Sequence, residues 1–186
     1  MKIVSLSGSP SAVSRSAALL RWCEAQLAPG ASSLHAIALR DLPATALLQA
    51  QFEDAGLQAS LRQVAEADVV LLATPIYKAA YSGLLKVFLD LLPQDGLAAK
   101  QVLPLATGGS LAHLLALDYG LRPVLHALGA RQLLDSVFAT DGQFQKHPTL
   151  GYVPDAETIA RMQRSLQPLL AAQPRPAARA ATAGTC

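Results

Sequence analysis

The chain has 186 residues, which fits one domain, and 52% of them are hydrophobic, enough for a large core. Only 15% are charged and the formal net charge is +2, too little for a nucleic-acid-binding or membrane-surface protein. No stretch approaches the roughly 18 apolar residues that span a bilayer, and the N-terminal apolar run is too short for a signal peptide. We therefore expect a cytoplasmic protein with neither a nucleic-acid nor a membrane partner.

Short apolar, strand-like runs alternate with amphipathic helical segments along the chain. In chain order, the predicted elements are strand 3–6, helix 15–27, strand 34–39, helix 57–65, strand 69–74, helix 82–92, strand 102–107, helix 110–128, strand 132–139 and helix 155–170. The pattern leaves the connection at 40–56 open, and residues 140–153 are expected to form a loop. The strand at 69–74 is apolar on both faces, which is typical of the centre of a parallel sheet, and we expect Pro75 to end it.

Five strands with helices between them imply right-handed crossovers and a parallel sheet. We therefore predict a flavodoxin-like α/β fold, a doubly wound five-stranded parallel sheet in the order 2-1-3-4-5 with helices on both faces. One domain is expected at 1–170. Residues 171–186 are rich in Ala, Pro and Arg without periodicity, and they are predicted to be a disordered tail. The weakly charged, Leu-rich composition favours a homo-oligomer.

Ligands of such a sheet bind beyond the carboxyl ends of its strands, which draws attention to the loops at 7–16, 75–83 and 107–113. The first loop contains GSPSAVSRS, which offers serine hydroxyls, the Arg15 guanidinium and the free N–H groups of a helix start. These groups suit a phosphate with two negative charges. The loop has neither the GK[ST] nor the GxGxxG pattern of other phosphate-binding loops. The alternative interpretation is an ordinary helix N-cap at Ser14.

The second loop places apolar and aromatic side chains after the central strand, in the order Pro75, Ile76, Tyr77. Such a shelf suits a flat heteroaromatic ring, and the alternative is that Tyr77 and Tyr81 cap the core. In the third loop, Gly108 and Gly109 directly follow a strand and let the backbone approach a ligand closely. An ordinary strand-to-helix turn is the alternative there.

The three loops together resemble one family. GSPSAVSRS in the first loop, ATPIYKAAYSGLLK at 73–86 and PLATGGSLAHLLALDYGLRPVL at 104–125 are similar to the NAD(P)H-dependent FMN reductases. Within that family, the nearest resemblance is to the reductase component of two-component alkanesulfonate monooxygenase systems. It extends over about residues 1–170, and the long stretch at 104–125 makes it specific, whereas a GSP motif alone would indicate only the fold.

The resemblance implies which residues hold FMN. The residues expected at the FMN phosphate are Ser9, Ser14, Arg15 and Ser16. Those expected around the isoalloxazine ring are Pro75, Ile76 and Tyr77 on one side, and Thr107, Gly108 and Gly109 on the other. The resemblance also matches Tyr119 to a tyrosine in a one-residue π-type widening of a helix at a tetramer interface, a feature linked to flavin release.

The residues around Tyr119 give independent support for an irregular helix. Pro123 has no N–H to donate to the Tyr119 carbonyl, and Gly120 weakens the same turn. A simple proline kink with Tyr119 packed in the core is the alternative interpretation.

The chemistry that the resemblance implies requires no catalytic side chain and no metal, because hydride passes from NAD(P)H to FMN while the protein orients the two rings. In agreement, the sequence has no GxSxG, no HExxH and no His/Cys cluster. His113 is expected to pack rather than react, and Lys78 to be a solvated side chain.

The predicted function is reduction of free FMN to FMNH2 by NADH or NADPH, for a partner flavin-dependent sulfonate monooxygenase. The resemblance favours a homotetramer. One alternative is an NAD(P)H-dependent reductase of quinones, azo dyes or metal oxyanions that retains FMN as a prosthetic group. A flavodoxin-like electron carrier is a further alternative, which the net charge of +2 disfavours. The choice between NADH and NADPH stays open, and no residue identifies the sulfonate.

Overall fold

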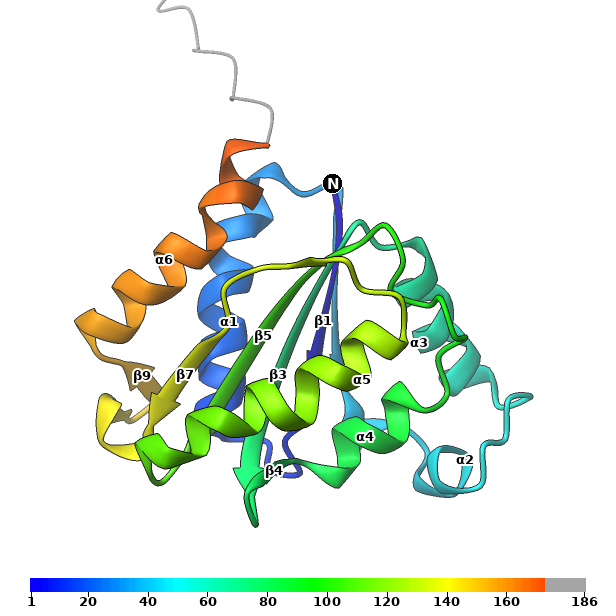
Figure 1. The fold of residues 1–186 in the computed structure, drawn as a ribbon, viewed down its shortest axis with the longest axis horizontal. Coiled ribbons are helices and arrows are strands. Elements are labelled where there is room, and N and C mark those ends of the chain that lie inside the picture. Colours follow the sequence, from blue (N-terminus) through cyan, green and yellow to red (C-terminus); the bar gives the residue numbers. More distant parts are fainter. Residues whose placement is uncertain (173–186) are drawn as a thin grey trace, which may run out of the picture.

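The computed structural model describes residues 1–172, and its centre is one mostly parallel sheet (Figure 1). The parallel strands are β1 (Lys2–Ser7), β2 (Ser33–Ala38), β3 (Val69–Tyr77), β5 (Gln101–Gly108), β6 (Gln132–Leu133) and β7 (Val137–Thr140). Their order is β2-β1-β3-β5, with β6 and β7 both paired to β5. Taken as one interrupted strand, β6 and β7 complete the predicted order 2-1-3-4-5, and the flavodoxin-like fold is confirmed.

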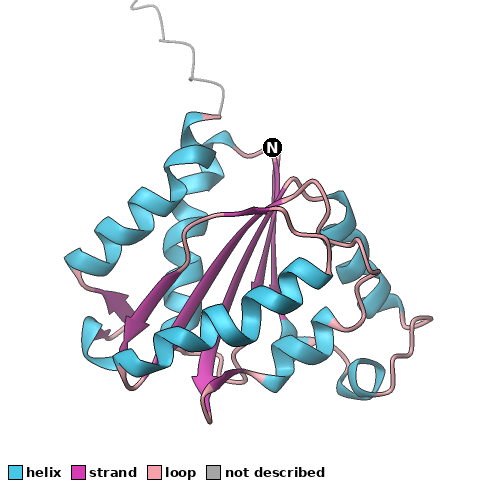
Figure 2. Cartoon of the chain, in the orientation of Figure 1, coloured by secondary structure: helices cyan, strands magenta, loops and turns pink. Residues whose placement is uncertain are grey.

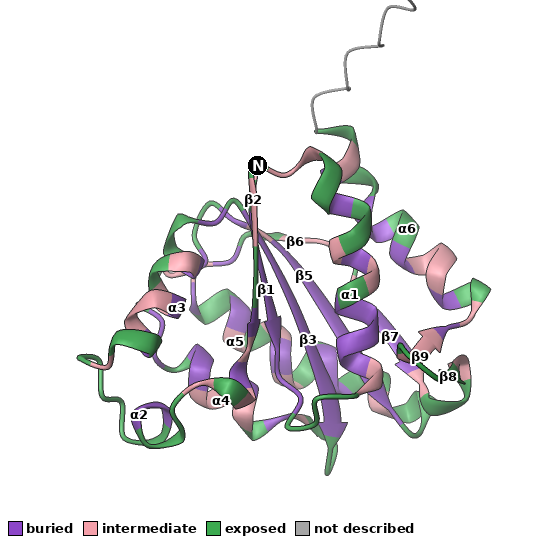
Figure 3. Ribbon diagram, turned by 180° about the vertical axis from the view of Figure 1, so that it is seen from behind, coloured by how far each residue is buried: buried purple, intermediate pink, exposed green. Residues whose placement is uncertain are grey.

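Helices cover both faces of this sheet (Figures 1 and 2). The longer helices are α1 (Arg15–Leu27) and α6 (Ala156–Ala171) on one face, and α3 (Ala55–Glu66), α4 (Gly83–Leu89) and α5 (Arg122–Ala127) on the other. The central strand β3 divides its side chains between two cores. Val70 and Leu72 pack with α3, α4 and α5, whereas Val69, Leu71 and Ala73 pack with α1 and α6. Burial on both faces, seen as the purple strands in Figure 3, explains the unbroken apolar run of β3.

The described structure ends one residue beyond α6. The predicted tail at 171–186 therefore lies, apart from its first two residues, outside the described residues, and the domain boundary at 170 stays a prediction. Within residues 1–172, no helix is both long and apolar enough to cross a membrane.

The prediction that Pro75 ends the central strand is wrong. β3 continues to Tyr77 and turns back antiparallel through β4 (Ala80–Tyr81). Proline is tolerated here because its fixed φ is compatible with extended backbone and only one N–H donor is lost. Lys78 and Ala79 form the turn with φ of 50° and 63°. Two positive φ values in succession are what a tight two-residue hairpin turn requires.

Two segments contain more structure than the sequence predicted. The connection at 40–56 includes the short helix α2 (Ala44–Leu48). The expected loop at 140–153 contains an antiparallel hairpin of β8 (Phe144–His147) and β9 (Gly151–Pro154). Because β8 is largely exposed and polar, it lacks the apolar alternation that marks a strand in a sequence.

Two other predicted elements are broken or shortened. The strand predicted at 132–139 is interrupted between β6 and β7, where Asp135 and Ser136 are poor strand formers. The helix predicted at 82–92 spans only Gly83–Leu89, because the chain tightens into i→i+3 bonds immediately after it.

Candidate functional site

The loop that follows β1 and the carboxyl ends of β3 and β5 meet at one edge of the sheet, the lower edge in Figure 1, and line one cavity of about 270 Å³. All of the residues predicted to contact FMN line this cavity: Ser9, Ser14, Arg15, Ser16, Pro75, Ile76, Tyr77, Thr107, Gly108 and Gly109. The remaining lining residues are Ser11, Val13, Asp141 and Tyr152. The structure thus brings the predicted set together from three separate parts of the chain.

The first loop is fixed to the second through Gly8. Its N–H donates to the Ala73 carbonyl at 2.8 Å, and its carbonyl accepts from the Ser82 hydroxyl at 2.6 Å. A Cβ on Gly8 would lie only 2.9 Å from Cβ of Leu85. Only glycine therefore allows the loop to approach α4 this closely, and the two walls of the cavity keep a constant separation.

The start of α1 forms the polar end of the cavity. Ser14 has extended backbone, and its hydroxyl accepts from the Ala17 N–H at 3.1 Å, so the N-cap that the sequence offered as the alternative interpretation is present. Ser9 is buried, and its hydroxyl accepts from the Ser11 N–H at 3.1 Å. The N–H groups of the first helical turn have no acceptor within the helix itself. They leave this end of the cavity suited to an anion, and the cap at Ser14 is compatible with that use.

Arg15 is the only cationic residue that lines the cavity in the described structure. Its Nη1 lies 3.4 Å from Oδ1 of Asp141, and its guanidinium carbon lies 4.8 Å from the ring centroid of Tyr152. Its Nε is buried without a hydrogen-bond partner among residues 1–172. Arg15 is therefore held in place by two neighbours while keeping donor capacity for a ligand.

The carboxyl ends of two neighbouring strands line another part of the cavity. Pro75 on β3 lies in register with Thr107 on β5, and the lining continues to Tyr77 and Gly109. A Cβ on Gly108 would lie 3.2 Å from both the Phe138 ring and a nitrogen of His113, so a larger residue there would force these neighbours or the backbone to shift.

The two ends of the cavity together fit FMN. A serine-rich helix start with one arginine suits the phosphate, because donors and positive charge converge there. Gly108 and Gly109, together with the partly exposed ring of Tyr77, give a cavity lining that suits a flat heteroaromatic ring.

Asp141 and Tyr152 line the cavity but were not predicted from the sequence. Asp141 directly follows β7, at the same sheet edge as the other three loops, so its position after the fifth strand was a usable signal. Tyr152 lies on β9, in a segment expected to be a loop. Contact between β9 and α1 brings it to the cavity, and Figures 1 and 3 both show the hairpin beside α1 and β7.

The predicted widening around Tyr119 is present. Residues Leu117–Leu121 form a π-helical turn between a 3₁₀ turn at Leu111–Leu114 and α5, so the helix predicted at 110–128 is divided. The Arg122 N–H donates to the Leu117 carbonyl across this turn. The alternative with Tyr119 in the core is wrong, because 80% of this residue is exposed.

His113 and Lys78 do not line the cavity. His113 lies behind Gly108, where its Nδ1 is buried without a hydrogen-bond partner in the described part of the chain. It lines a separate shallow groove with Ala79 and Tyr119. Lys78 lies exposed at the tip of the β3–β4 hairpin, in agreement with a solvated side chain.

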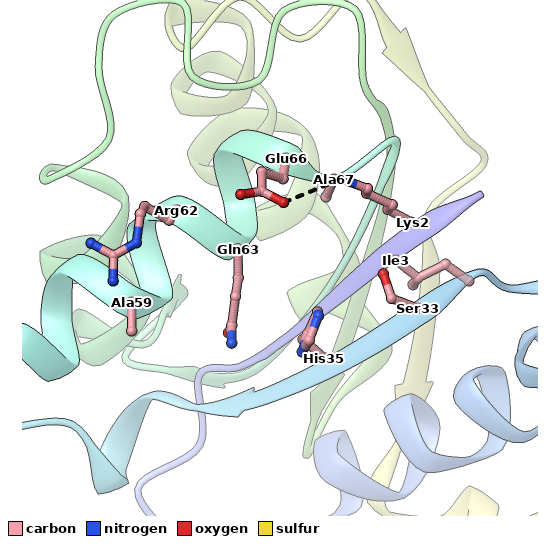
Figure 4. A pocket seen from close by; sticks show the side chains of 9 residues that line it. All are labelled: Lys2, Ile3, Ser33, His35, Ala59, Arg62, Gln63, Glu66 and Ala67. Carbon is pink, nitrogen blue, oxygen red and sulfur yellow. Dashed lines mark hydrogen bonds and ion pairs between the residues drawn. The ribbon is translucent and has the colours of Figure 1, made fainter.

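A second groove, shown in Figure 4, lies at the other edge of the sheet, where β1 and β2 begin. His35 on β2 and Gln63 on α3 point into it, and Lys2 pairs with Glu66 at 3.2 Å beside it. None of the predicted site residues lines this groove. Ligands of doubly wound sheets bind at the carboxyl edge, which makes the cavity beside Arg15 the candidate functional site.

Two perturbed ionisable groups lie in the interior instead of the cavity. Burial raises the pKa of the Cys23 thiol to about 12. Burial lowers the pKa of Lys100, whose ammonium donates to the carbonyls of Ala65 and Ala67 at 2.7 and 2.8 Å. Both groups support the packing of α1 and α3 against the sheet.

Comparison with known proteins agrees with this geometry. Residues 1–145 match the family model described as NADPH-dependent FMN reductase. The chain belongs to this family. The match covers all three loops of the cavity, and it confirms the predicted family, the enzyme class of NAD(P)H-dependent FMN reductases and the use of FMN and NAD(P)H.

Individual members of the family are similar over most of their length. The FMN reductase (NADPH) of Pseudomonas putida is 48% identical over 77% of this chain and 73% of its own length. That of Escherichia coli is 44% identical over 85% and 83%. The NADH-dependent FMN reductase SfnF of Pseudomonas fluorescens is 37% identical over 77% and 79%. The apo form of an NADH:FMN oxidoreductase, EmoB, superposes with a TM-score of 0.81 at 40% identity, over 94% of this chain and 91% of that one.

Proposed function

We propose that this chain reduces free FMN with NAD(P)H and releases FMNH2 to a partner flavin-dependent sulfonate monooxygenase. The observation that carries the proposal is the cavity that the serine-rich start of α1 shares with the strand ends at 75–77 and 107–109. The reductant is a cytoplasmic metabolite, which supports a cytoplasmic location.

Each end of the cavity has its own task in this proposal. Ser9, Ser14, Arg15 and Ser16 bind the phosphate through hydroxyls, the guanidinium and the first N–H groups of α1. The segments at 75–77 and 107–109 hold the ring between them. When bound, FMN accepts a hydride from the nicotinamide, which is chemistry that the cofactors themselves supply.

The contribution of the chain is therefore positional. The bonds of Gly8 to Ala73 and Ser82 fix the spacing of the cavity walls, and the stack of Arg15 on Tyr152 orients the phosphate end. Holding the two rings in contact supplies most of the catalysis in such a reaction.

The sulfonate monooxygenase partner is supported by the motif resemblance of the stretch at 104–125 to reductases of that system. We also propose a homotetramer in which the π-helical turn meets another copy. Support comes from large apolar side chains that lie exposed on this turn or just before it in the chain, namely Leu111, Leu114, Leu115 and Tyr119. Exposed apolar side chains grouped in this way are typical of an interaction surface.

The test is NAD(P)H oxidation by purified, colourless protein while FMN is titrated with NADH and NADPH in parallel. Saturation with micromolar FMN, without another acceptor, is the expected result. A tightly retained yellow cofactor with activity only toward quinones, azo dyes or metal oxyanions would instead show a prosthetic flavin. Failure to oxidise NAD(P)H with any acceptor would leave the electron-carrier function.

A further inference from the structure

We propose that Asp141 lowers the affinity of the cavity for FMN by competing with the flavin phosphate for Arg15. The proposal rests on the proposed function, because it takes this cavity to be the FMN site. Its consequence is specific: Asp141 makes FMN an exchangeable substrate instead of a retained cofactor.

The charges of the cavity balance before any flavin enters. Among residues 1–172, Arg15 and Asp141 are the only charged residues that line it. Oδ1 of Asp141 lies 3.4 Å from Nη1 of Arg15, and its Oδ2 lies 3.9 Å from the position that a Cβ on Gly109 would take. The carboxylate therefore stands between the first and third loops, and a phosphate that reaches Arg15 must meet a like charge there.

Asp141 is held by a network that does not use its carboxylate. It begins a 3₁₀ turn, Asp141–Gln143, in which the Thr140 N–H donates to the side-chain oxygen of Gln143 at 3.0 Å. Arg161 donates to the same oxygen at 3.2 Å and to the Phe138 carbonyl at 2.7 Å. A change from carboxylate to amide therefore leaves the turn in place.

Arg15 keeps its position without Asp141. The ring of Tyr152 supports the guanidinium at 4.8 Å, and this ring is itself braced edge-on by Phe144, with 6.5 Å between the ring centroids. The ion pair is long compared with a charge-assisted hydrogen bond, and its side chains are 33% and 49% exposed. A pair of this kind is weak. A flavin phosphate can therefore replace the carboxylate of Asp141 as the partner of Arg15, but the carboxylate stays nearby and repels it.

The test compares FMN with riboflavin, which has the same ring and no phosphate. Flavin fluorescence titrations would use the full chain as wild type, as Asp141→Asn, and as Asp141→Ser should the asparagine variant fold poorly. Glu53→Gln is the matched control, because it changes the net charge equally at an exposed residue outside the cavity. We expect Asp141→Asn to bind FMN more tightly by on the order of tenfold at low ionic strength. Riboflavin binding should not change.

Salt adds a readout that a purely structural role would not produce. The gain of Asp141→Asn in FMN affinity should shrink as ionic strength rises, because the repulsion is screened. Equal or weaker FMN binding by both Asp141 variants, or an equal gain for riboflavin or in Glu53→Gln, would overturn the role of Asp141. Wild-type protein that binds neither flavin would overturn the proposed function itself, so the two failures are distinct.

Discussion

Replacement of Gly8 by Ala tests whether the first loop must touch α4. An added Cβ would lie 2.9 Å from Cβ of Leu85 and 3.2 Å from the Ala73 carbonyl oxygen, neither of which can rotate away. Overpacking of this kind costs about 1–3 kcal/mol. Replacing glycine by alanine also lowers the conformational entropy of the unfolded chain, which stabilises the folded state by only about 0.4–1 kcal/mol. We therefore expect net destabilisation, seen as a fall in melting temperature of about 2–4 °C for each kcal/mol in a chain of this size.

Gly83→Ala is the matched control, because a Cβ there would meet nothing within 4 Å. Neither Gly83 nor Gly8 has a left-handed φ, so backbone strain does not enter the comparison. Gly83→Ala should be neutral or stabilising, and it should leave FMN affinity unchanged. Gly8→Ala should weaken FMN binding as well, since the loop that carries Ser9 moves. Denaturant unfolding and FMN titration of both variants check this, and equal stability of the two would refute the argument.

Three further predictions address separate parts of the chain. Arg15→Met should weaken FMN binding by about 10–150-fold, the equivalent of one charge-assisted contact of about 1.5–3 kcal/mol, while riboflavin titrations stay unchanged. Tyr119→Ala should purify yellower, turn over free FMN more slowly and elute as a smaller species in gel filtration, because a largely exposed apolar ring is removed; no change in colour or turnover would contradict the role of Tyr119. Asp155 caps α6, and a hydrogen bond from the Thr158 N–H at 2.8 Å lowers the pKa of its carboxyl group. The ionised carboxylate therefore stabilises the fold fully at pH values above the ordinary pKa of 3.8, and this stabilisation is lost as the pH falls through the lowered pKa. Asp155→Asn should therefore be less stable than the wild type at pH 7, and this difference in unfolding free energy should shrink as the pH falls. Curves of unfolding free energy against pH that stay parallel for the two proteins would contradict this.

The fold and the location of the site could be predicted from the sequence because both follow from periodicity and topology. The doubly buried run of β3 identifies the sheet centre, and parallel strands bring their following loops to one edge. Local chemistry also offered the cap at Ser14, as the alternative to phosphate binding, and it predicted an irregular helix near Pro123. The one-residue widening was predicted only by the family resemblance, because apolar spacing does not show one extra residue in a turn that leaves Tyr119 exposed.

What the sequence could not supply is the set of contacts made by residues distant in the chain. The β8–β9 hairpin has no strand pattern of its own, and it is placed by long-range packing. Gly151 approaches Val13 so closely that a Cβ would overlap it, and the Leu150 carbonyl accepts from Arg21 at 2.9 Å. These contacts bring Tyr152 onto the guanidinium of Arg15.

The position of the proposed phosphate site and its affinity for phosphate therefore depend on different parts of the sequence. In the proposed function, the serine-rich loop and the start of α1 determine where the flavin phosphate binds, and a local sequence pattern encodes them. The strength of binding depends on the net charge around Arg15, and that charge is set by Asp141, far away in the sequence. Two chains with the same first loop can thus differ in whether flavin stays or leaves, according to the residue that follows their last strand.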